Sequence, residues 1–257
     1  MPPGTASSAS GGCSAVPAIL DLPSPNQDER PHGTPIDTLV LHYTGMQSAE
    51  AAIARLRDPA AKVSSHYVVD EDGTVLRLVP EARRAWHAGE SFWRGGRALN
   101  ANSIGIEIVN PGHDWGYRPF PVLQLVALCD LCLEILSRHP IPPRNVVAHS
   151  DIAPARKQDP GELFDWRGLA RNGVGLWPDI ADLGEIGPLR AAHDLAPVRA
   201  ALREVGYEVA PGGEADRDLA TVLRAFQRHW RPEAVNGMAD LGTVARLFGV
   251  RDLLDVE

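Results

Sequence analysis

Short runs of apolar and β-branched residues recur through the first two thirds of the chain and are typical of β-strands. The run IDTLVLHY is almost continuously apolar, which indicates a buried strand. Another run places Asp72 and Gly73 between two apolar halves, and this pair predicts the turn of a hairpin. Four segments have the strand pattern: IDTLVLHY (36–43), SSHYVVDEDGTVLRLVP (64–80), SIGIEIV (103–109) and NVVAHS (145–150).

Segments with helical spacing of apolar residues alternate with these runs. SAEAAIARLRD, residues 48–58, predicts a short helix that Ser48 caps at its start. VLQLVALCDLCLEILSRH, residues 122–139, has apolar residues three and four positions apart and predicts a long helix. Because strands and helices interleave, we expect an α/β fold with a mixed central β-sheet flanked by helices.

The two ends of the chain have a different character. Residues 1–30 are rich in proline, glycine and serine and predict a flexible segment. Residues 181–195 contain glycine and proline and predict a linker. Beyond the linker, residues 196–257 hold three segments with helical spacing and predict a small three-helix domain. The main domain is therefore expected over residues 31–180.

The composition excludes several classes of protein. The chain has 257 residues, of which 44% are apolar and 23% charged, as in an ordinary globular protein. A formal net charge of -8 argues against a nucleic-acid partner, which would require a basic face. No apolar run is long enough to predict a transmembrane segment. The sequence does not reveal an oligomeric state.

Cys129 and Cys132 form a C-x-x-C pair inside the long predicted helix. Residues three apart on a helix share one face, so core packing explains the pair. Redox or zinc chemistry is the alternative, but no second pair of cysteines or nearby histidines completes such a site.

His42 and His149 each end a predicted strand, and Asp159 follows His149 by ten residues across a loop with Pro154 and Pro160. Active sites of open sheets gather at the carboxyl ends of strands. Two imidazoles and one carboxylate are the ligands of a catalytic zinc ion that keeps a fourth position open. Strand-end histidines taken alone are more often structural.

Two further polar side chains favour a catalytic site. Lys157 stands two residues before Asp159, where a cation can stabilise an oxyanion beside a metal ion. Glu107 alternates with isoleucines in SIGIEIV, so it either faces solvent or has a function. In a dry site this carboxylate could move a proton between a water molecule and a leaving amine.

These residues lie in motifs that resemble a known family. The segments LVLHYTG, SSHYVVDEDG, AWHAG, NANSIGIEIVNPG and VVAHSDIAPARKQDPG occur in the order of the zinc-dependent N-acetylmuramoyl-L-alanine amidases of the AmpD and AmiD type. Phage amidase endolysins and animal peptidoglycan recognition proteins are akin to them. The H-x7-K-x-D spacing also matches, and the resemblance covers roughly residues 30 to 180. The C-terminal motifs GY, FQRHW, NG and LGT resemble a three-helix peptidoglycan-binding domain.

The resemblance implies one zinc ion per chain and hydrolysis of the amide that joins muramic acid, or its 1,6-anhydro form, to L-alanine. His42, His149 and Asp159 would be the zinc ligands. Glu107 would orient or deprotonate the attacking water, and Lys157 would stabilise the oxyanion. Peptidoglycan or muropeptide fragments would be the partners.

Further residues of these motifs are candidates for substrate binding. Trp86 and His87 of AWHAG would line the cleft, although a loop anchored by a buried aromatic ring explains them equally well. Asn102 would bind the stem peptide, or would be only the turn residue before the strand. Five further histidines are interpreted as structural, surface or core residues: His66, His113, His139, His193 and His229.

Three alternatives remain open at this stage. A non-catalytic peptidoglycan receptor can share the fold, and a zinc peptidase would cut another bond of the stem peptide. Within the amidase reading, the absence of a signal peptide favours a cytoplasmic enzyme of cell-wall recycling. The wall-binding motifs favour instead an envelope or periplasmic enzyme that acts on the sacculus.

Overall fold

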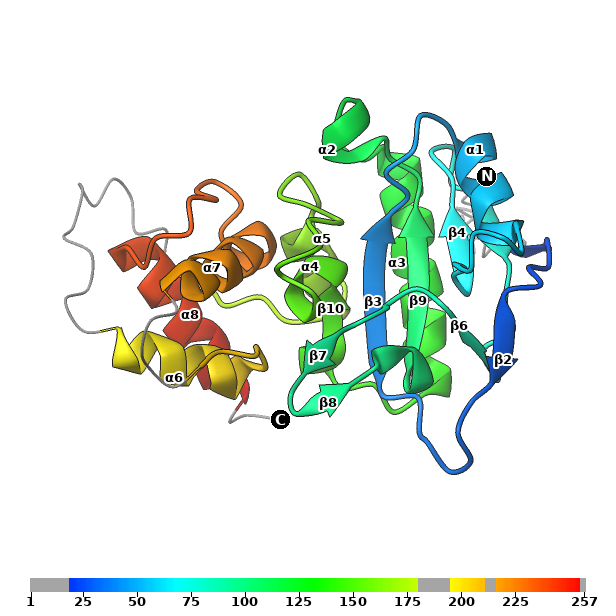
Figure 1. Cartoon of the computed structure of the whole chain (residues 1–257). Coiled ribbons are helices and arrows are strands. Elements are labelled where there is room, and N and C mark those ends of the chain that lie inside the picture. Colours follow the sequence, from blue (N-terminus) through cyan, green and yellow to red (C-terminus); the bar gives the residue numbers. More distant parts are fainter. Residues whose placement is uncertain (1–18, 180–194, 211–215, 255–257) are drawn as a thin grey trace, which may run out of the picture.

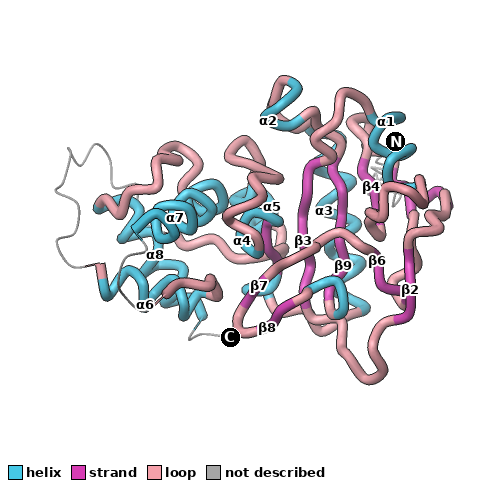
Figure 2. The backbone as a smooth tube through the Cα atoms, in the orientation of Figure 1, coloured by secondary structure: helices cyan, strands magenta, loops and turns pink. Residues whose placement is uncertain are grey.

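The computed structural model describes residues 19–179, 195–210 and 216–254. Six strands form its central sheet: β1 (Ile19–Asp21), β3 (Thr38–Tyr43), β4 (Tyr67–Val69), β5 (Val75–Arg77), β9 (Ser103–Ile108) and β10 (Val146–Ala148). Their order is β1-β5-β4-β9-β3-β10. Figure 1 shows β4, β9, β3 and β10 in this order, and Figure 2 shows the same arrangement of β4, β9 and β3 as a backbone tube. Strands β4, β9, β3 and β10 run parallel, whereas β5 is antiparallel to β4. The predicted mixed sheet is confirmed.

Two antiparallel ribbons, eight α-helices and two 3₁₀ helices (Leu99–Ala101 and Pro143–Asn145) complete the described part of the chain. The ribbons pair β2 (Gln27–Glu29) with β6 (Arg83–Ala85), and β7 (Phe92–Trp93) with β8 (Gly96–Arg97). The helices are α1 (Ala49–Arg57), α2 (Gly112–Trp115), α3 (Val122–Arg138), α4 (His149–Ile152), α5 (Trp166–Arg171), α6 (Ala196–Val205), α7 (Asp216–Trp230) and α8 (Leu241–Leu253). None of them has the combined length and hydrophobicity that a membrane span requires.

The two faces of the central sheet carry different side chains, because successive residues of a strand point to opposite faces. The isoleucines of β9 and the leucines of β3 are fully buried and form one core with the apolar side of α3. The alternate residues of these strands, including His42 and Glu107, therefore face away from α3. The side chains of His42 and Glu107 thus lie on the face of the sheet opposite α3.

The helices flanking this sheet begin and end close to where the sequence predicts them. Ser48 caps α1, since its side chain accepts a hydrogen bond from the backbone N–H of Ala51 at 3.2 Å. Cys132 of α3 is buried in the core beneath the sheet, and Cys129 packs at its edge. The packing interpretation of the C-x-x-C pair agrees with these positions.

The predicted flexible N-terminal segment is only partly described, because residues 1–18 lie outside the described residues. Residues 19–30 differ from that prediction, since they include β1 and β2, which pair with β5 and β6. The guanidinium of Arg30 donates hydrogen bonds to the carbonyl oxygens of Ala101 and Ser103, each at 2.8 Å. Strands of three residues have no detectable hydrophobic period, so the sequence does not reveal them.

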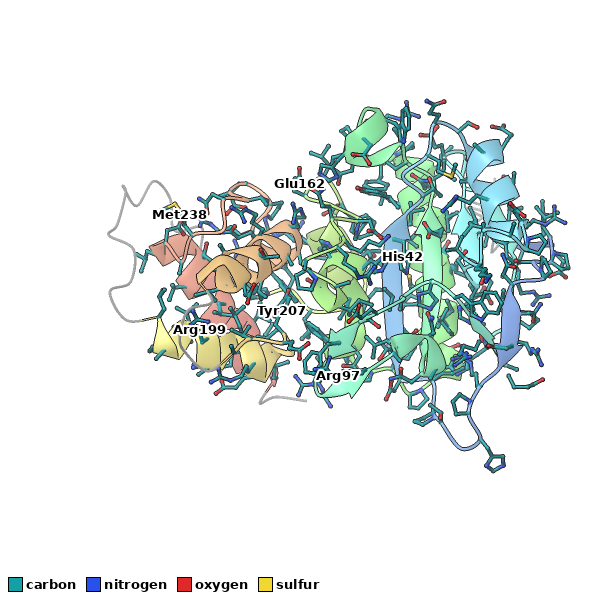
Figure 3. All side chains as sticks on the ribbon, in the orientation of Figure 1. His42, Arg97, Glu162, Arg199, Tyr207 and Met238 are labelled. Atoms are coloured by element: carbon teal, nitrogen blue, oxygen red, sulfur yellow. The ribbon has the colours of Figure 1, made fainter. Side chains whose placement is uncertain are left out.

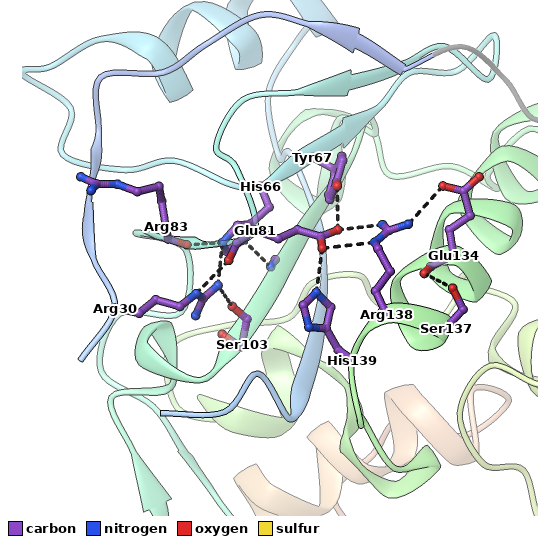
Figure 4. A network of polar contacts seen from close by, with 11 residues as sticks. Arg30, His66, Tyr67, Glu81, Arg83, Ser103, Glu134, Ser137, Arg138 and His139 are labelled. Atoms are coloured by element: carbon purple, nitrogen blue, oxygen red, sulfur yellow. Dashed lines mark hydrogen bonds and ion pairs between the residues drawn. The ribbon is translucent and has the colours of Figure 1, made fainter. Parts of the chain in front are cut away.

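A polar network fastens the β4–β5 hairpin to the end of α3 (Figure 4). The carboxylate of Glu81 accepts hydrogen bonds from Tyr67 at 2.7 Å, from Arg138 at 2.8 Å and from His139 at 2.7 Å. Burial alone would raise the pKa of Glu81, but these three donors outweigh burial and lower it to about 2. Glu81 is therefore an anion at neutral pH and holds the two elements together.

The three predicted C-terminal helices are present as α6, α7 and α8, and most of the predicted linker, residues 181–194, lies outside the described residues. Figure 1 shows these helices packed beside β10, α4 and α5. Buried residues of α6, α7 and α8 share one apolar cluster with Val40 of β3 and Val147 of β10. The helical unit thus contributes to the core next to the sheet.

Polar contacts between the two parts centre on Asp151 of α4, which is fully buried. The Tyr207 hydroxyl donates to Asp151 Oδ1 at 2.6 Å, and His229 Nδ1 contacts Asp151 Oδ2 at 2.7 Å. The His229 ring stacks between Trp166 and Trp230, with ring centroids 3.7 and 3.6 Å away. From sequence His229 is interpreted only as a surface or core residue. In the structure it is buried and links α7 to α4 and α5.

Candidate active site

Three parallel strands bring polar side chains to the same edge of the sheet. Strand β3 lies between β9 and β10, and all three run in one direction. In the register of these strands His42 pairs with Glu107, and Leu41 pairs with Ala148, the residue before His149. The carboxyl ends therefore coincide, as expected for the site of an open sheet. Figure 3 shows His42 on β3 within this region.

His42, His149 and Asp159 converge on one point. His42 Nδ1 lies 2.8 Å from His149 Nδ1 and 3.2 Å from Asp159 Oδ2, and His149 Nδ1 lies 3.0 Å from Asp159 Oδ2. Ligand atoms around one tetrahedral zinc ion are about 3.3 Å apart, so these atoms fit a common metal ion. Within the described residues they form the one group of three or more potential ligands that meets this criterion.

The local structure around His149 differs from the strand end that the sequence predicts. Strand β10 ends at Ala148, and His149 is the first residue of the short helix α4. The carboxylate of Asp151 accepts a hydrogen bond from the backbone N–H of Ala148 at 2.8 Å, which closes the first turn. The backbone N–H of Ser150 donates to the carbonyl oxygen of Asp159 at 3.0 Å. This hydrogen bond closes the loop between Ser150 and Asp159 and places Asp159 beside His149.

The charge states of these ligands suit metal binding. Burial lowers the pKa of His42 to about 4, so its imidazole is neutral at pH 7 and keeps a lone pair. Burial alone would raise the pKa of Asp159, but the neighbouring His149 and His42 rings outweigh burial and lower it. The resulting set is an anionic carboxylate and buried imidazoles, which is the donor set that zinc prefers.

Glu107 stands beside this group, opposite His42 in the β3–β9 register. Burial raises the pKa of Glu107 well above its ordinary range, and the nearby Asp159 carboxylate adds to the rise. The ammonium of Lys157 acts in the opposite direction. Among the described residues, Glu107 Oε2 is buried without a hydrogen-bond partner. A carboxyl group held in this way is suited to taking up and releasing a proton.

A cavity of about 330 Å³ opens over these side chains. Glu107, His149, Lys157 and Asp159 are among the residues that line it. Other residues around it were not predicted as site residues. Tyr43 and Arg156 lie within the motifs LVLHYTG and VVAHSDIAPARKQDPG, whereas Met46, Arg55 and Asp114 lie outside the motifs. The structure therefore brings His149, Asp159, Glu107 and Lys157 together in one hollow, and the third predicted ligand, His42, lies buried in contact with His149 and Asp159.

The predicted substrate-binding residues Trp86, His87 and Asn102 lie in different places. Trp86 and His87 both line the cavity, but the His87 ring is mostly buried behind His42. Asn102 precedes β9 at the opposite edge of the sheet, where its side-chain amide donates to Asp37 Oδ1 at 2.7 Å. The structure does not bring Asn102 to the cavity, which agrees with the alternative reading of a turn residue.

A neighbouring asparagine, Asn100, was not predicted as a site residue but supports the loop beside the cavity. Asn100 Oδ1 accepts hydrogen bonds from the backbone N–H groups of His87 at 3.0 Å and Ala88 at 2.7 Å. Asn100 thereby holds the loop that carries AWHAG against His42 and His149. Its only sequence signal is the motif NANSIGIE, which contains both asparagines and does not distinguish them.

Two histidines, a carboxylate and an adjacent ionisable glutamate in a cavity are typical of metal-dependent hydrolases. Comparison with known proteins assigns the family. The family model of N-acetylmuramoyl-L-alanine amidases matches residues 32–162. The chain is 40% identical to the N-acetylmuramoyl-L-alanine amidase AmiD of Escherichia coli, over 91% of this chain and 90% of AmiD. The chain therefore belongs to the N-acetylmuramoyl-L-alanine amidase family.

Other relatives agree with this assignment. The 1,6-anhydro-N-acetylmuramyl-L-alanine amidase AmpD of Enterobacter cloacae is 35% identical over 56% of this chain and 84% of AmpD. The structure of E. coli AmiD with the substrate anhydro-N-acetylmuramic acid-L-Ala-D-γ-Glu-L-Lys has a TM-score of 0.77 at 39% identity, covering 88% of this chain and 92% of that one. AmpDh3 of Pseudomonas aeruginosa, in complex with an anhydromuramic pentapeptide, has a TM-score of 0.76 at 36% identity and covers 87% and 94%.

Proposed function

We propose that this chain hydrolyses the amide bond between N-acetylmuramic acid, or its 1,6-anhydro form, and the L-alanine of the stem peptide. The observation that carries the proposal is the convergence of His42, His149 and Asp159 beside the buried carboxyl group of Glu107. A non-catalytic receptor on the same fold would need neither a complete set of metal-binding side chains nor a carboxyl group positioned for proton transfer.

The cofactor in this proposal is one zinc ion per chain, held by His42, His149 and Asp159. Two imidazole nitrogens and one carboxylate fit zinc better than magnesium or calcium, which prefer oxygen ligands. Zinc bound there would supply Lewis-acid polarisation of the scissile carbonyl and of the attacking water.

Glu107 and Lys157 have complementary roles in the proposal. Glu107 takes one proton from the attacking water and delivers it to the nitrogen of L-alanine as the carbon–nitrogen bond breaks. Burial raises the pKa of Glu107, so this carboxyl group takes up a proton more readily than an exposed glutamate does. Lys157 donates a hydrogen bond to the oxyanion that forms on the lactyl carbonyl. The products are a lactyl carboxylate and a peptide with a free amino-terminal L-alanine.

The substrate class in this proposal is a muropeptide with an intact stem peptide, and the role is cell-wall recycling. E. coli AmiD and P. aeruginosa AmpDh3 were each solved with an anhydromuramyl peptide, which supports such a fragment for this chain as well. Trp86 on the cavity wall offers an aromatic face for the sugar or the peptide. Comparing the rates on anhydro-muropeptides and on intact sacculi tests the choice of fragment over polymer.

The C-terminal unit, residues 196–257, is proposed to bind wall material, as its GY, FQRHW and LGT motifs suggest. Co-sedimentation of the full-length Glu107→Gln variant with purified sacculi tests this role, since the bound polymer would remain uncut. The chain should pellet with the sacculi, and a chain that stays in the supernatant would contradict wall binding.

Fractionation of the tagged native chain then tests the cytoplasmic location against an envelope location.

Zinc content is the first test of the enzyme. The purified chain should contain about one zinc ion, lose both zinc and activity on treatment with a chelator, and regain both when zinc is restored. A metal-free chain that still binds the muropeptide would support the receptor instead.

A further inference from the structure

The loop that carries AWHAG forms a layer directly behind the metal ligands. His87 Nδ1 lies 3.0 Å from His42 Nε2, the nitrogen on the far side of the ring from Asp159. The two rings meet edge to face, with centroids 5.1 Å apart. The carbonyl oxygen of Ala88 lies 3.3 Å from His149 Nε2. Each ligand histidine therefore has its second nitrogen against this one loop.

The hydrogen bonds behind His87 have a fixed direction. Ser103 Oγ lies 2.5 Å from the carbonyl oxygen of Leu99 and 3.1 Å from His87 Nε2. A hydroxyl has one hydrogen and a carbonyl oxygen can only accept, so the Ser103 hydrogen points to Leu99. Ser103 Oγ can then only accept from the ring, which requires the proton of His87 to sit on Nε2.

The proton position on His87 also determines the proton position on His42, its hydrogen-bond partner. With its proton on Nε2, a neutral His87 has a lone pair on Nδ1 and accepts a hydrogen bond from His42 Nε2–H. His42 Nδ1 then carries the free lone pair, and it points at Asp159 and His149. The same holds for His149, because the Ala88 carbonyl oxygen can only accept and so requires the proton on Nε2.

The space for the His87 ring is built into β9. A Cβ atom on Gly105 would lie 2.4 Å from His87 Cγ, so the ring occupies the place of a side chain in the middle of the strand. Asn100 fixes the loop backbone at His87 and Ala88. His87 thus stands in a fitted slot between Ser103, Gly105 and His42.

We propose that His87 is a positioning residue that, with Ser103 behind it, fixes His42 in the tautomer whose Nδ1 is free for the metal ion. The inference rests on the proposed zinc site. Hydrogen bonds of this kind orient ligand histidines and commonly change metal affinity by about 10 to 100-fold when removed.

Two substitutions at His87 separate this role from simple packing. His87→Phe keeps the ring but removes the acceptor, and should weaken zinc binding by about 10 to 100-fold. His87→Asn keeps an acceptor oxygen near the Nδ1 position and should recover most of the affinity. Ser103→Ala should have a smaller effect in the same direction. Competition with a chromophoric chelator measures the affinities, and the visible spectrum of the cobalt-substituted chain reports the ligand geometry.

Gln124→Leu is the matched control for the loss of a buried polar group. Gln124 lies on α3, across the sheet from the metal ligands, and donates to the carbonyl oxygens of Val69 and Val109. This variant should be less stable, yet it should bind zinc like the wild type. Equal zinc affinity in His87→Phe and wild type would overturn the inference, and so would an equal loss in Gln124→Leu and His87→Phe.

Nitrogen-15 correlation spectra of the zinc-loaded chain test the proton positions directly. His42 and His87 should each carry a proton on Nε2 and none on Nδ1. A proton on His87 Nδ1 would overturn the inference even if zinc binds tightly. A wild-type chain that binds no zinc would instead contradict the proposed function, so the two failures are distinguishable.

Discussion

Glu107 shows how much the properties of a single side chain depend on its position in the fold. The strand β9 alternates between the core beneath α3 and the cavity, so the isoleucines enter the core and Glu107 enters the cavity. Burial beside Asp159 then raises its pKa. The sequence alone left two readings, solvent exposure or a function, and the carboxyl group in fact lies at the metal-ligand group.

Replacing Glu107 by glutamine should separate catalysis from metal binding. Glutamine keeps the size of the side chain but cannot take up a proton, so turnover of an anhydro-muropeptide should fall by about 10²-fold or more. Zinc content should be unchanged, because Glu107 is not one of the three ligands. Near-normal turnover in this variant would remove Glu107 from the proton transfer.

The metal ligands should respond differently. Asp159→Ala removes the charged ligand from a buried group with His42 and His149, so zinc and activity should be lost together. Metal analysis alongside the activity assay gives the comparison. Full activity without zinc in this variant would contradict the metal site.

At the scale of elements, the long and strongly patterned segments were predictable from sequence. The strands β3 and β9 and the helix α3 have clear periods, and each forms close to its predicted range. The short strands β1 and β2 and the helical start of α4 were not predictable. They have three or four residues each, and their pairing depends on partners far along the chain.

The attachment of the β4–β5 hairpin to α3 should make stability depend on acid pH through Glu81. The folded state lowers the pKa of Glu81 from its ordinary 4.5 to about 2, so the ionised form stabilises the fold. That contribution is complete above pH 4.5 and disappears as the pH falls towards about 2. With solvent screening it amounts to about 1 to 2 kcal/mol.

Urea unfolding of the wild type and of Glu81→Gln at several pH values measures this contribution. The wild type should be more stable at pH 7, and the difference should narrow as the pH falls from 4.5 towards 2. A difference that stays constant over this range would show that the charge of Glu81 does not stabilise the fold.

At the scale of the whole molecule, the C-terminal helices and the amidase fold share one apolar cluster and the buried Asp151. The sequence predicted the three helices from their spacing. It could not predict their contacts with Asp151, because nothing in the sequence around Tyr207 and His229 indicates a contact with a residue 56 or 78 positions away. The same limit applies to the contact between His42 and His87, which only the folded chain brings together.

Because of this shared core, the described parts of the chain should unfold in one cooperative transition. His229→Phe keeps the stacking with Trp166 and Trp230 but removes the hydrogen bond to Asp151, and should lower the free energy of unfolding by about 1.5 to 3 kcal/mol. Arg97→Ala, which removes the exposed ion pair with Glu208 and a cation–π contact with Phe92, is the control and should cost about 1 kcal/mol or less. Two separate transitions in the wild type would contradict the shared core.

The bond that is cut is the most direct test of the whole account. Mass spectrometry of anhydro-N-acetylmuramyl peptide after incubation with the zinc-loaded chain identifies both products. We expect free anhydro-N-acetylmuramic acid and an intact peptide that begins with L-alanine, with no such products from Asp159→Ala. Fragments that retain the lactyl–alanine amide and are cut elsewhere in the stem peptide would contradict the account.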